Sequence, residues 1–238
     1  MLFLISFLLL AVHVLAADIV PAPIEGLPGV FLRSEELPEG YTEGPIMWSG
    51  FHDYFDSAPG VNASTKSALK GLQLNGTVQE VYHELAGRGL FLYPTNTSDL
   101  PAKVAAIQNK NLDDDFSPPT RNQIKTCGVG GVGRMFAFDL WDGATYLAGL
   151  PDEARCANTG RTCGRISCSC FFSSYVLTIV LTDNNYVLEY PCNLFASYAW
   201  EIYDGCSYAG GDNRQCQGTM REVIINFRTV VGLSAEKC

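Results

Sequence analysis

The first 126 residues of this 238-residue chain contain no cysteine, and all nine cysteines lie at or after Cys127. Histidine is scarce as well, because the chain has three and the cysteine-rich half has none. A zinc site needs two C-x-x-C pairs or nearby histidine ligands, whereas Cys168 and Cys170 form only C-x-C. We therefore expect a disulfide framework, with no metal site and no cofactor.

Basic residues are outnumbered, with 16 Lys and Arg against 25 Asp and Glu, and the net charge is −9. An acidic surface repels phosphate backbones, so we expect no nucleic-acid partner. The chain also lacks the G-x-S-x-G motif of esterases and the H-E-x-x-H motif of zinc proteases. Of the histidines beyond the N-terminus, His83 falls on the polar side of a predicted helix and His52 follows no catalytic pattern. These features favour a protein that is not an enzyme.

The N-terminus is an apolar run without charge, MLFLISFLLLAVHVLA. It predicts a signal peptide over residues 1–16, with Val14 and Ala16 as the small residues before the cut and Ala17 as an alternative end. A membrane anchor is the competing interpretation, but the run is shorter than the ~20 residues that span a bilayer. We therefore expect a secreted, extracellular protein.

Residues 17–45 hold four prolines among glycines and acids, which predicts an extended leader. A cysteine-free region, residues 46–120, follows it, with Ile46, Trp48 and Phe51 as expected buried anchors and a strand that Gly50 interrupts. This region also holds three N-x-S/T sequons, which are candidate glycosylation sites on exposed loops. They lie at Asn62, Asn75 and Asn96.

Two helices are predicted in the cysteine-free region. Residues 78–87 have apolar side chains at helical spacing, with Thr77 and Glu80 as a capping box and Gly87 at the end. A second helix is predicted from Ser98, with Pro101 in its first turn. The apolar side chains that it is expected to bury are Leu100, Val104 and Ile107.

Residues 121–238 predict a cysteine-rich α+β domain: a disulfide-stapled antiparallel sheet with two helices packed on it. The predicted helices cover residues 136–150 and the segment from Cys192 to Cys206, and a loop between them holds Cys156 and Cys163. Two β-branched and aromatic runs within residues 172–190 flank Asp183–Asn185 and predict a hairpin. A final strand is predicted over residues 221–232.

Two motifs imitate known binding loops. Gly128, Gly130 and Gly133 match G-x-G-x-x-G, but the preceding PPTRNQIKTC is too polar for the central strand of a nucleotide-binding sheet. We therefore expect no nucleotide partner and interpret the glycines as a flexible connection. Asp113 and Asp115 begin a calcium-like loop, yet Pro118 stands where that loop requires glycine.

Two alternative functions depend on particular side chains. Asp139 and Asp142 are one helical turn apart, a separation that suits the two carboxylates of a carbohydrate-active hydrolase, although a solvated helix face is the simpler interpretation. Trp141 and Trp200 are candidates for binding cell-wall glycans, although we favour core positions for both.

The cysteine-rich half resembles a known group of proteins. The carrying residues are C-G-R-I-S-C-S at 163–169, a hairpin that ends in T-D-N-N, Cys192 before a helix that ends I-Y-D-G-C at 206, and a closing V-I-I-N-F. They are similar to small secreted fungal proteins, in particular the killer toxins of smut fungi and their fungal relatives. The upstream G-P-I-M-W-S-G and L-N-G-T-V-Q-E-V-Y resemble leader regions of that group.

The resemblance implies an α/β sandwich held by disulfides. It implies the pairs Cys127–Cys206, Cys156–Cys192 and Cys168–Cys238, and leaves three cysteines to compete for one further bond. These three are Cys163, Cys170 and Cys216. The family has a further cysteine near the hairpin turn, where this chain has none, so Cys163 is the candidate for the odd thiol. We expect a monomer, with a covalent dimer through the odd cysteine as the alternative.

The resemblance also implies a function. The toxins are thought to block calcium channels through a lysine at the position of Ile166, and the nearest cation here is Arg165, so channel block is not carried over and Arg165 is a candidate surface-binding residue. Related fungal proteins are secreted effectors. We therefore expect a non-enzymatic effector or toxin-like protein, with a host protein or membrane as its target, and a cell-wall glycan-binding protein as the alternative.

Overall fold

The computed structural model describes most of the chain from Gly40 onward. The described residues are 40–57, 59, 61–113, 123–128, 135–171, 174–182, 184–208, 215–222 and 227–234. The predicted signal peptide, most of the leader, the calcium-like loop after Asp113, Gly130, Gly133 and Cys238 lie outside this part of the chain.

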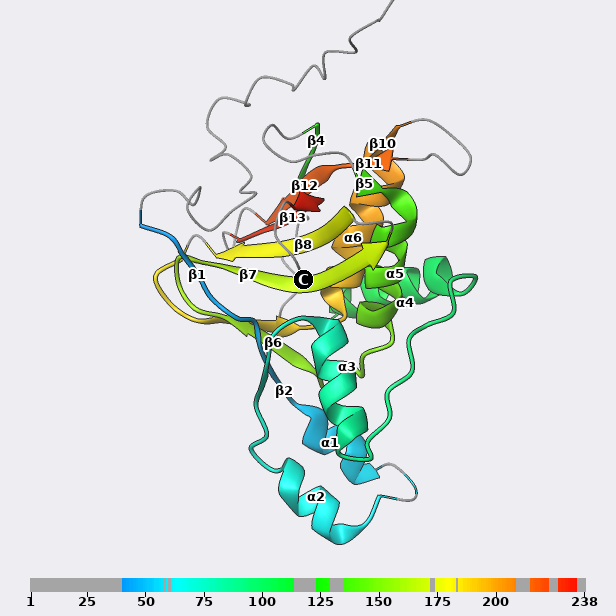
Figure 1. Cartoon of the computed structure of the whole chain (residues 1–238), viewed down its shortest axis with the longest axis vertical. Coiled ribbons are helices and arrows are strands. Elements are labelled where there is room, and N and C mark those ends of the chain that lie inside the picture. The colour runs from blue at the N-terminus through cyan, green and yellow to red at the C-terminus, as the bar shows by residue number, and fades with distance from the viewer. Residues whose placement is uncertain are drawn as a thin grey trace, which may run out of the picture.

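Six helices and several short or long strands are described (Figure 1). The N-terminal part contains β1 (Thr42–Glu43), β2 (Met47–Ser49), α1 (Phe51–Ser57), α2 (Ala63–Leu69), β3 (Leu74–Asn75), α3 (Val78–Gly87) and α4 (Leu100–Asp113). The C-terminal part contains β4 (Gln123–Cys127), β5 (Met135–Phe136), α5 (Ala137–Ala148), β6 (Arg155–Asn158), β7 (Thr162–Phe171), β8 (Ser174–Thr182), β9 (Leu188–Pro191), α6 (Leu194–Cys206), β10 (Ser207–Tyr208), β11 (Gln215–Cys216), β12 (Gly218–Glu222) and β13 (Phe227–Ser234).

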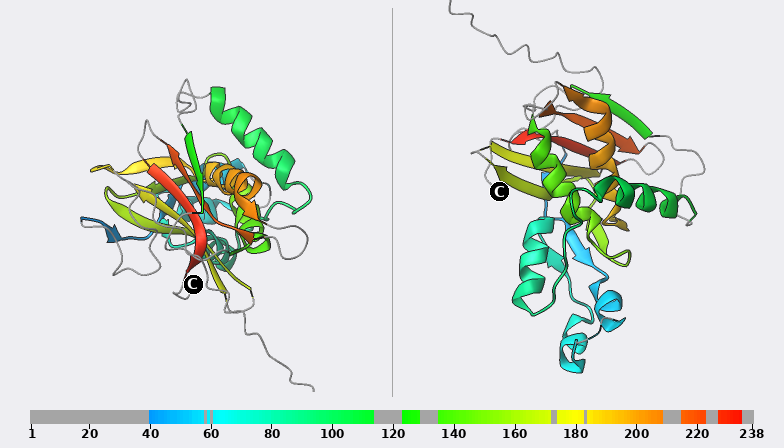
Figure 2. Two further views of the ribbon diagram at one scale, coloured as in Figure 1. Left: turned by 90° about the horizontal axis from the view of Figure 1, so that it is seen from above. Right: turned by 90° about the vertical axis from the view of Figure 1, so that its right-hand side faces the viewer.

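A six-stranded sheet in the order β1-β7-β8-β13-β12-β4 is the largest layer. Its strand pairs are antiparallel except β1 with β7, which is parallel. The helices α5 and α6 lie side by side against this sheet, and α4 packs on α6 (Figure 2). The described residues therefore form an α+β structure in which two helices cover an antiparallel sheet, as the sequence predicts.

Strand pairing joins the N-terminal part to the cysteine-rich half. β2 pairs with β6, and β1 pairs with β7 through the register Thr42↔Thr162. The end of the segment predicted as an extended leader, residues 17–45, is therefore tied to the edge of the sheet by backbone hydrogen bonds of β1. The helices α1, α2 and α3 extend from the end of the molecule opposite β4 (Figure 1).

Several predicted elements are confirmed. Thr77 and Glu80 form the capping box of α3, with Thr77 N–H donating to Glu80 Oε2 at 2.7 Å. The expected apolar side chains of α4 are buried, and so are the three N-terminal anchors. Gly50 has φ +82° and lies between β2 and α1, so the expected interruption is a turn from strand to helix. α5 and α6 lie close to their predicted ranges.

The hairpin predicted around Asp183–Asn185 is wrong. β8 pairs with β7 and β13, whereas β9 pairs with β6 in a separate four-stranded sheet. The final strand is also wrong, because Glu222 pairs with Phe227 and the run folds back as β12 and β13. Residues expected to form a loop around Cys156 belong to β6 and β7, and the N-terminal region holds four described helices rather than two.

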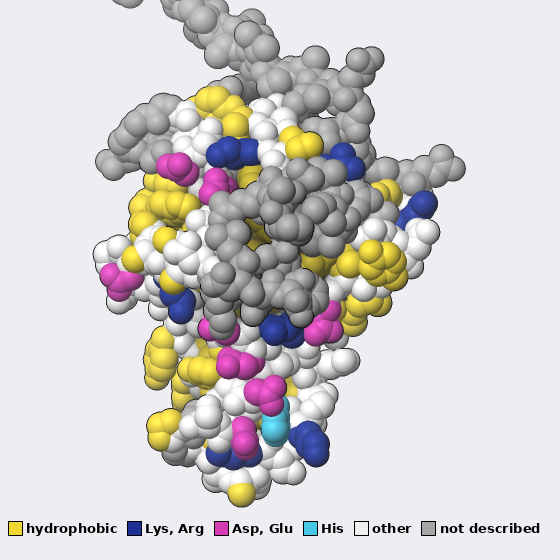
Figure 3. Space-filling view, turned by 180° about the vertical axis from the view of Figure 1, so that it is seen from behind, with side chains coloured by type: hydrophobic (Ala, Val, Ile, Leu, Met, Phe, Trp, Pro, Cys, Tyr) yellow, Lys and Arg dark blue, Asp and Glu magenta, His cyan; other side chains and the backbone are white. Residues whose placement is uncertain are grey.

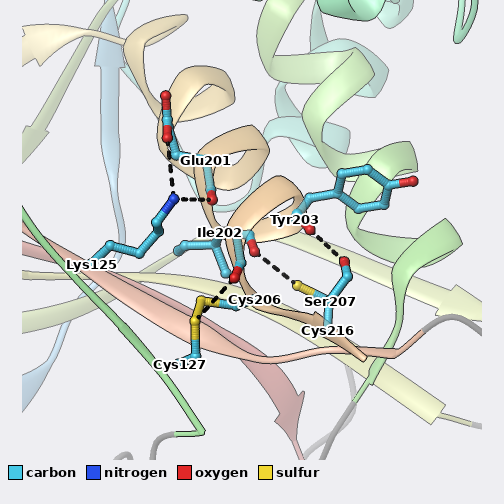
Figure 4. Close-up of a disulfide and its surroundings, with 9 residues drawn as sticks. Lys125, Cys127, Glu201, Ile202, Tyr203, Cys206, Ser207 and Cys216 are labelled. Carbon is cyan, nitrogen blue, oxygen red and sulfur yellow. Dashed lines mark hydrogen bonds and ion pairs between the residues drawn. A yellow bond between two sulfur atoms is a disulfide. The ribbon is translucent and has the colours of Figure 1, made fainter. Parts of the chain in front are cut away.

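Two disulfides match those that the resemblance implies. Cys127–Cys206 joins β4 to the end of α6 (Figure 4), and Cys156–Cys192 joins β6 to the residue two before α6. Cys168 is also disulfide-bonded, to a cysteine outside the described side chains. Cys163 and Cys216 are buried and carry thiols, and the Cys216 thiol donates to the carbonyl of Ile202 at 3.4 Å.

Candidate functional site

A pocket of about 450 Å³ lies where β1, β7 and the start of α3 meet, and it contains Arg165 in its wall. This volume falls in the range of small-ligand sites, ~300 to 1,000 Å³. Its lining residues are Glu43, Gly44, Pro45, Gly76, Thr77, Glu80, Arg165 and Cys168. The pocket is therefore built from two parts of the chain that are far apart in sequence, and the pairing of β1 with β7 brings them together.

An ion pair forms one side of the pocket. Arg165 Nη2 lies 3.1 Å from Glu43 Oε1, and the two side chains are 24% and 41% exposed. Arg165 precedes an irregularity in the β7–β8 register, between Arg165 and Ser167. Ile166, at the position where the resemblance would place the toxins' lysine, is fully buried. The guanidinium of Arg165 is thus the cation that β7 presents at this edge of the sheet.

The opposite side is the first turn of α3. Glu80 Oε2 accepts from the backbone N–H and the hydroxyl of Thr77, at 2.7 and 3.0 Å. The neighbouring side chain, Gln79, forms two hydrogen bonds with β7. Its Nε2 donates to Ser167 Oγ at 3.0 Å, and its Oε1 accepts from the N–H of Cys168 at 3.2 Å. These bonds hold α3 and β7 at a fixed separation, so both walls are preorganised for binding.

Gly76 is required at the rim because of its backbone conformation and its surroundings. Its φ is +109°, which L side chains rarely adopt, and a Cβ there would lie 2.3 Å from Glu80 Oε2. Its carbonyl accepts a hydrogen bond of 2.8 Å from Trp48 Nε1. A glycine therefore allows the chain to pass close to the capping carboxylate that lines the pocket.

The pocket combines two carboxylates and one guanidinium with the small or apolar surfaces of Gly44, Pro45 and Gly76. Such a site accepts hydrogen bonds through glutamate and donates them through arginine, next to a small apolar surface. It therefore suits a polar group of a ligand or of a partner's side chain. Acidic side chains, interspersed with basic ones, also occur on the face shown in Figure 3, over the end that carries α1 and α2.

The Cys163 thiol lies on β7 near this ion pair, and it is 6% exposed. Burial raises the pKa of Cys163 to about 12, and the carboxylate of Glu43 adds to this rise against the opposing effect of Arg165. A thiol with such a pKa is not ionised at neutral pH and is a poor nucleophile. Cys163 is therefore a structural residue of β7.

Asp139, the candidate catalytic carboxylate, is 2% exposed, so the predicted solvated helix face is wrong for this residue. Its Oδ2 has no hydrogen-bond partner, and burial raises the pKa of Asp139 to about 6, with a further contribution from Asp142. The side chain is shielded from solvent and therefore cannot contact a polysaccharide in this conformation. A general acid at this position thus requires an opening of the structure.

The candidate glycan-binding tryptophans pack against each other. The rings of Trp141 and Trp200 are 5.6 Å apart in an edge-to-face arrangement, and Trp200 stacks on Tyr203 at 5.1 Å. Both tryptophans are half-buried and lie against the hydrophobic core between α5 and α6. The core interpretation therefore accounts for both residues.

The remaining predicted residues are separate from the pocket. His83 is exposed on α3, and His52 Nδ1 lies 3.2 Å from Asp53 Oδ1 on the surface of α1. The sequon residues Asn62, Asn75 and Asn96 are all exposed, as candidate glycosylation sites must be. Gly128 follows β4, which is an edge strand antiparallel to β12, and not the buried parallel strand that precedes the glycines of a dinucleotide site.

Arg165 is a candidate residue from the sequence alone, whereas its partner Glu43 is not. Glu43 falls in the segment predicted as leader, and Glu80 is identified only as a helix cap. No local pattern marks either as a pocket residue, because the pairing of β1 with β7 is a contact between distant segments.

In the described part of the chain, no helix is long and apolar enough to cross a membrane.

Comparisons with known proteins give no relative for this chain: no protein-family model, curated protein or solved structure matches it.

Proposed function

We propose that the protein is a secreted fungal effector or toxin-like protein that acts on a host or competitor cell by binding, without catalysis. The signal-peptide pattern and the three exposed sequon asparagines support secretion. The two disulfides support an oxidising compartment, because such bonds persist mainly outside the cytosol. The packing of α5 and α6 on an antiparallel sheet supports a killer-toxin-like arrangement.

The observation that carries this proposal is the preorganised pocket with the Arg165–Glu43 ion pair in its wall. A binding protein needs polar groups that are held in place before the ligand arrives, since ordering them afterwards reduces affinity. Here α3 and β7 are connected by the bonds of Gln79, and Glu80 is fixed by the capping box. The target is a host protein or membrane component that presents a polar group to this pocket.

The test uses the mature chain, purified from a eukaryotic secretion host. It is infiltrated into leaf tissue of several plant species and added to cultures of competing fungi, with heat-denatured protein as the control. Cell death, an altered defence response or arrested growth is the expected result. The absence of all three responses at every dose and in every species would contradict the proposal.

A further inference from the structure

Two aromatic rings project from the segment between α3 and α4. Leu90 and Leu92 are buried, whereas Phe91 is 57% exposed and Tyr93 is 77% exposed. Burial that alternates in this way is typical of an extended chain, in which side chains two residues apart lie on one side and are separated by ~7 Å. Phe91 and Tyr93 therefore form one outward-facing surface, which we name the aromatic ledge.

The backbone of the ledge is held at both ends. Leu90 N–H donates to the carbonyl of Leu85 at 2.9 Å, and Thr95 N–H donates to the carbonyl of Thr145 at 3.0 Å. Gly149 of the segment after α5 lies against it so closely that a Cβ would be 2.5 Å from the carbonyl oxygen of Tyr93. The two rings are thus presented on a fixed backbone and not on a mobile loop.

A sequon lies three residues beyond the ledge. Asn96 is exposed, and its carbonyl accepts from Asp99 N–H at 3.0 Å in the turn that leads into α4. Its Nδ2 donates to Asp99 Oδ2 at 3.3 Å. Attachment of a glycan replaces one hydrogen of this amide and leaves the other, so the bond to Asp99 is compatible with modification.

The other two sequons have no such neighbour. The three residues before Asn62 are Pro59, Gly60 and Val61, and those before Asn75 are Leu72, Gln73 and Leu74. Neither stretch contains an aromatic side chain, although both asparagines are exposed. Asn96 is therefore the sequon with an exposed aromatic surface within three residues on its N-terminal side.

We propose that the N-linked glycan on Asn96 covers the aromatic ledge, with its first sugars packed on Tyr93 and Phe91. This inference rests on the secretion that the proposed function includes. The C–H face of an N-acetylglucosamine ring is apolar and packs on the face of an aromatic ring, while its hydroxyls remain in water. Covering the ledge removes two exposed aromatic rings from water.

The covalent attachment to Asn96 favours this glycan over a free ligand as the group that covers the ledge. Three residues span at most ~11 Å, so the first sugars remain close to Tyr93 at a high effective concentration. An oligosaccharide or a partner protein from solution has to compete with that tethered sugar. The ledge is therefore a site for the protein's own modification, and glycosylation at Asn96 stabilises the fold more than glycosylation at Asn62 or Asn75.

The test compares melting temperatures of secreted, glycosylated variants. Asn96→Gln is made in the natural chain and in a ledge variant that carries Phe91→Thr and Tyr93→Thr, both exposed positions that tolerate change. In the natural chain, Asn96→Gln is expected to lower Tm by about 2 to 4 °C, which is the shift of a stacking contact in a protein of this size. In the ledge variant the same change lowers Tm by less than half as much.

Asn62→Gln and Asn75→Gln are the matched controls, since their effects on Tm are expected to be equal in both backgrounds. Trimming the glycans to a single N-acetylglucosamine retains most of the Asn96 effect, because the first sugars make the contact. Mass spectrometry of the secreted chain reports occupancy independently of any activity on cells. An unoccupied Asn96, or an Asn96→Gln shift that is the same in both backgrounds, would overturn the proposal, even where the protein acts as an effector.

Discussion

The guanidinium of Arg165 lies 3.1 Å from the carboxylate of Glu43, which joins the long strand β7 to the two-residue edge strand β1. This relationship turns an edge of the main sheet into one wall of a pocket. Backbone hydrogen bonds from Thr42 N–H to the carbonyl of Arg161 and from Gly44 N–H to the carbonyl of Cys163 also hold β1 against β7.

Removing this ion pair is expected to have a small effect on stability. Glu43→Gln and Arg165→Gln each lower the free energy of unfolding by about 0.5 to 1 kcal/mol, since both groups are partly solvated and the attraction is screened. The loss of unfolding free energy in the double variant should differ from the sum of the losses in the two single variants by no more than about 1 kcal/mol, as measured by urea denaturation. A loss above about 3 kcal/mol would show that the pair is a core element and not a wall of a binding site.

The buried carboxyl of Asp139 is expected to make stability depend on pH. Its pKa is about 6 in the folded protein and near 3.8 in the unfolded chain, so the folded state binds more protons between these values. This carboxyl therefore stabilises the folded protein most below about pH 4, and that stabilisation is lost as the pH rises from 4 through 6.

Asp139→Asn is expected to flatten this dependence, with urea midpoints compared between pH 4.5 and pH 7.5. Asp142→Asn is the matched control on the same helix, and it retains most of the dependence because burial is the larger cause of the shift. An Asp139→Asn variant with the same pH profile as the natural chain would contradict the assignment.

Alanine substitutions at two glycines with positive φ distinguish the cost of backbone strain from the cost of steric crowding. Gly71 and Gly76 have φ +78° and +109°, but a Cβ at Gly71 meets nothing within 4 Å, whereas one at Gly76 meets Glu80. Gly71→Ala should lower stability by about 1 to 2 kcal/mol through the left-handed conformation alone. Gly76→Ala should lower it by about 1 kcal/mol more, because it also disturbs the cap of α3. Equal thermal shifts for the two variants would contradict the role of Gly76.

The thiols of Cys163 and Cys216 are expected to resist alkylation in the native protein. Both are buried, and the pKa of Cys163 is about 12, so little thiolate exists at pH 8. Iodoacetamide should label both only after denaturation without reductant, as peptide mass spectrometry would show. Rapid native labelling of Cys163, or its recovery in a disulfide, would refute the assignment.

Local patterns were sufficient for α3, α4, α5 and α6, and insufficient for α1, α2 and the sheets. Thr77 and Glu80 mark the start of α3 by capping chemistry within one turn, and the apolar spacing of α5 and α6 reflects faces that really are buried. By contrast, β8 and β9 are close in sequence but belong to different sheets. Pairing with β13 and with β6 decides their places, and those partners leave no local signal.

The same distinction applies to the candidate site. Arg165 is recognisable because it stands near the position that the resemblance marks, whereas Glu43 and Gly76 become pocket residues only through the pairing of β1 with β7 and of β2 with β3. The prediction for Asp139 was wrong in a different way, because the sequence indicated a solvated side chain and the structure buries it. A carboxylate in a helix is normally solvated, and its burial depends on the packing of α5 against neighbouring elements, which the sequence does not record.

The most direct test of the account is the dose of protein needed for a response in leaf tissue, compared between the natural chain and the double variant Glu43→Gln and Arg165→Gln. The matched control is Arg88→Gln, which removes another arginine–glutamate pair, with Glu84, at the far end of α3. The double variant is expected to fold, to be secreted and to need at least about ten times the dose, equivalent to about 1.4 kcal/mol of binding, while the control matches the natural chain. Equal doses for the double variant and the natural chain would contradict it.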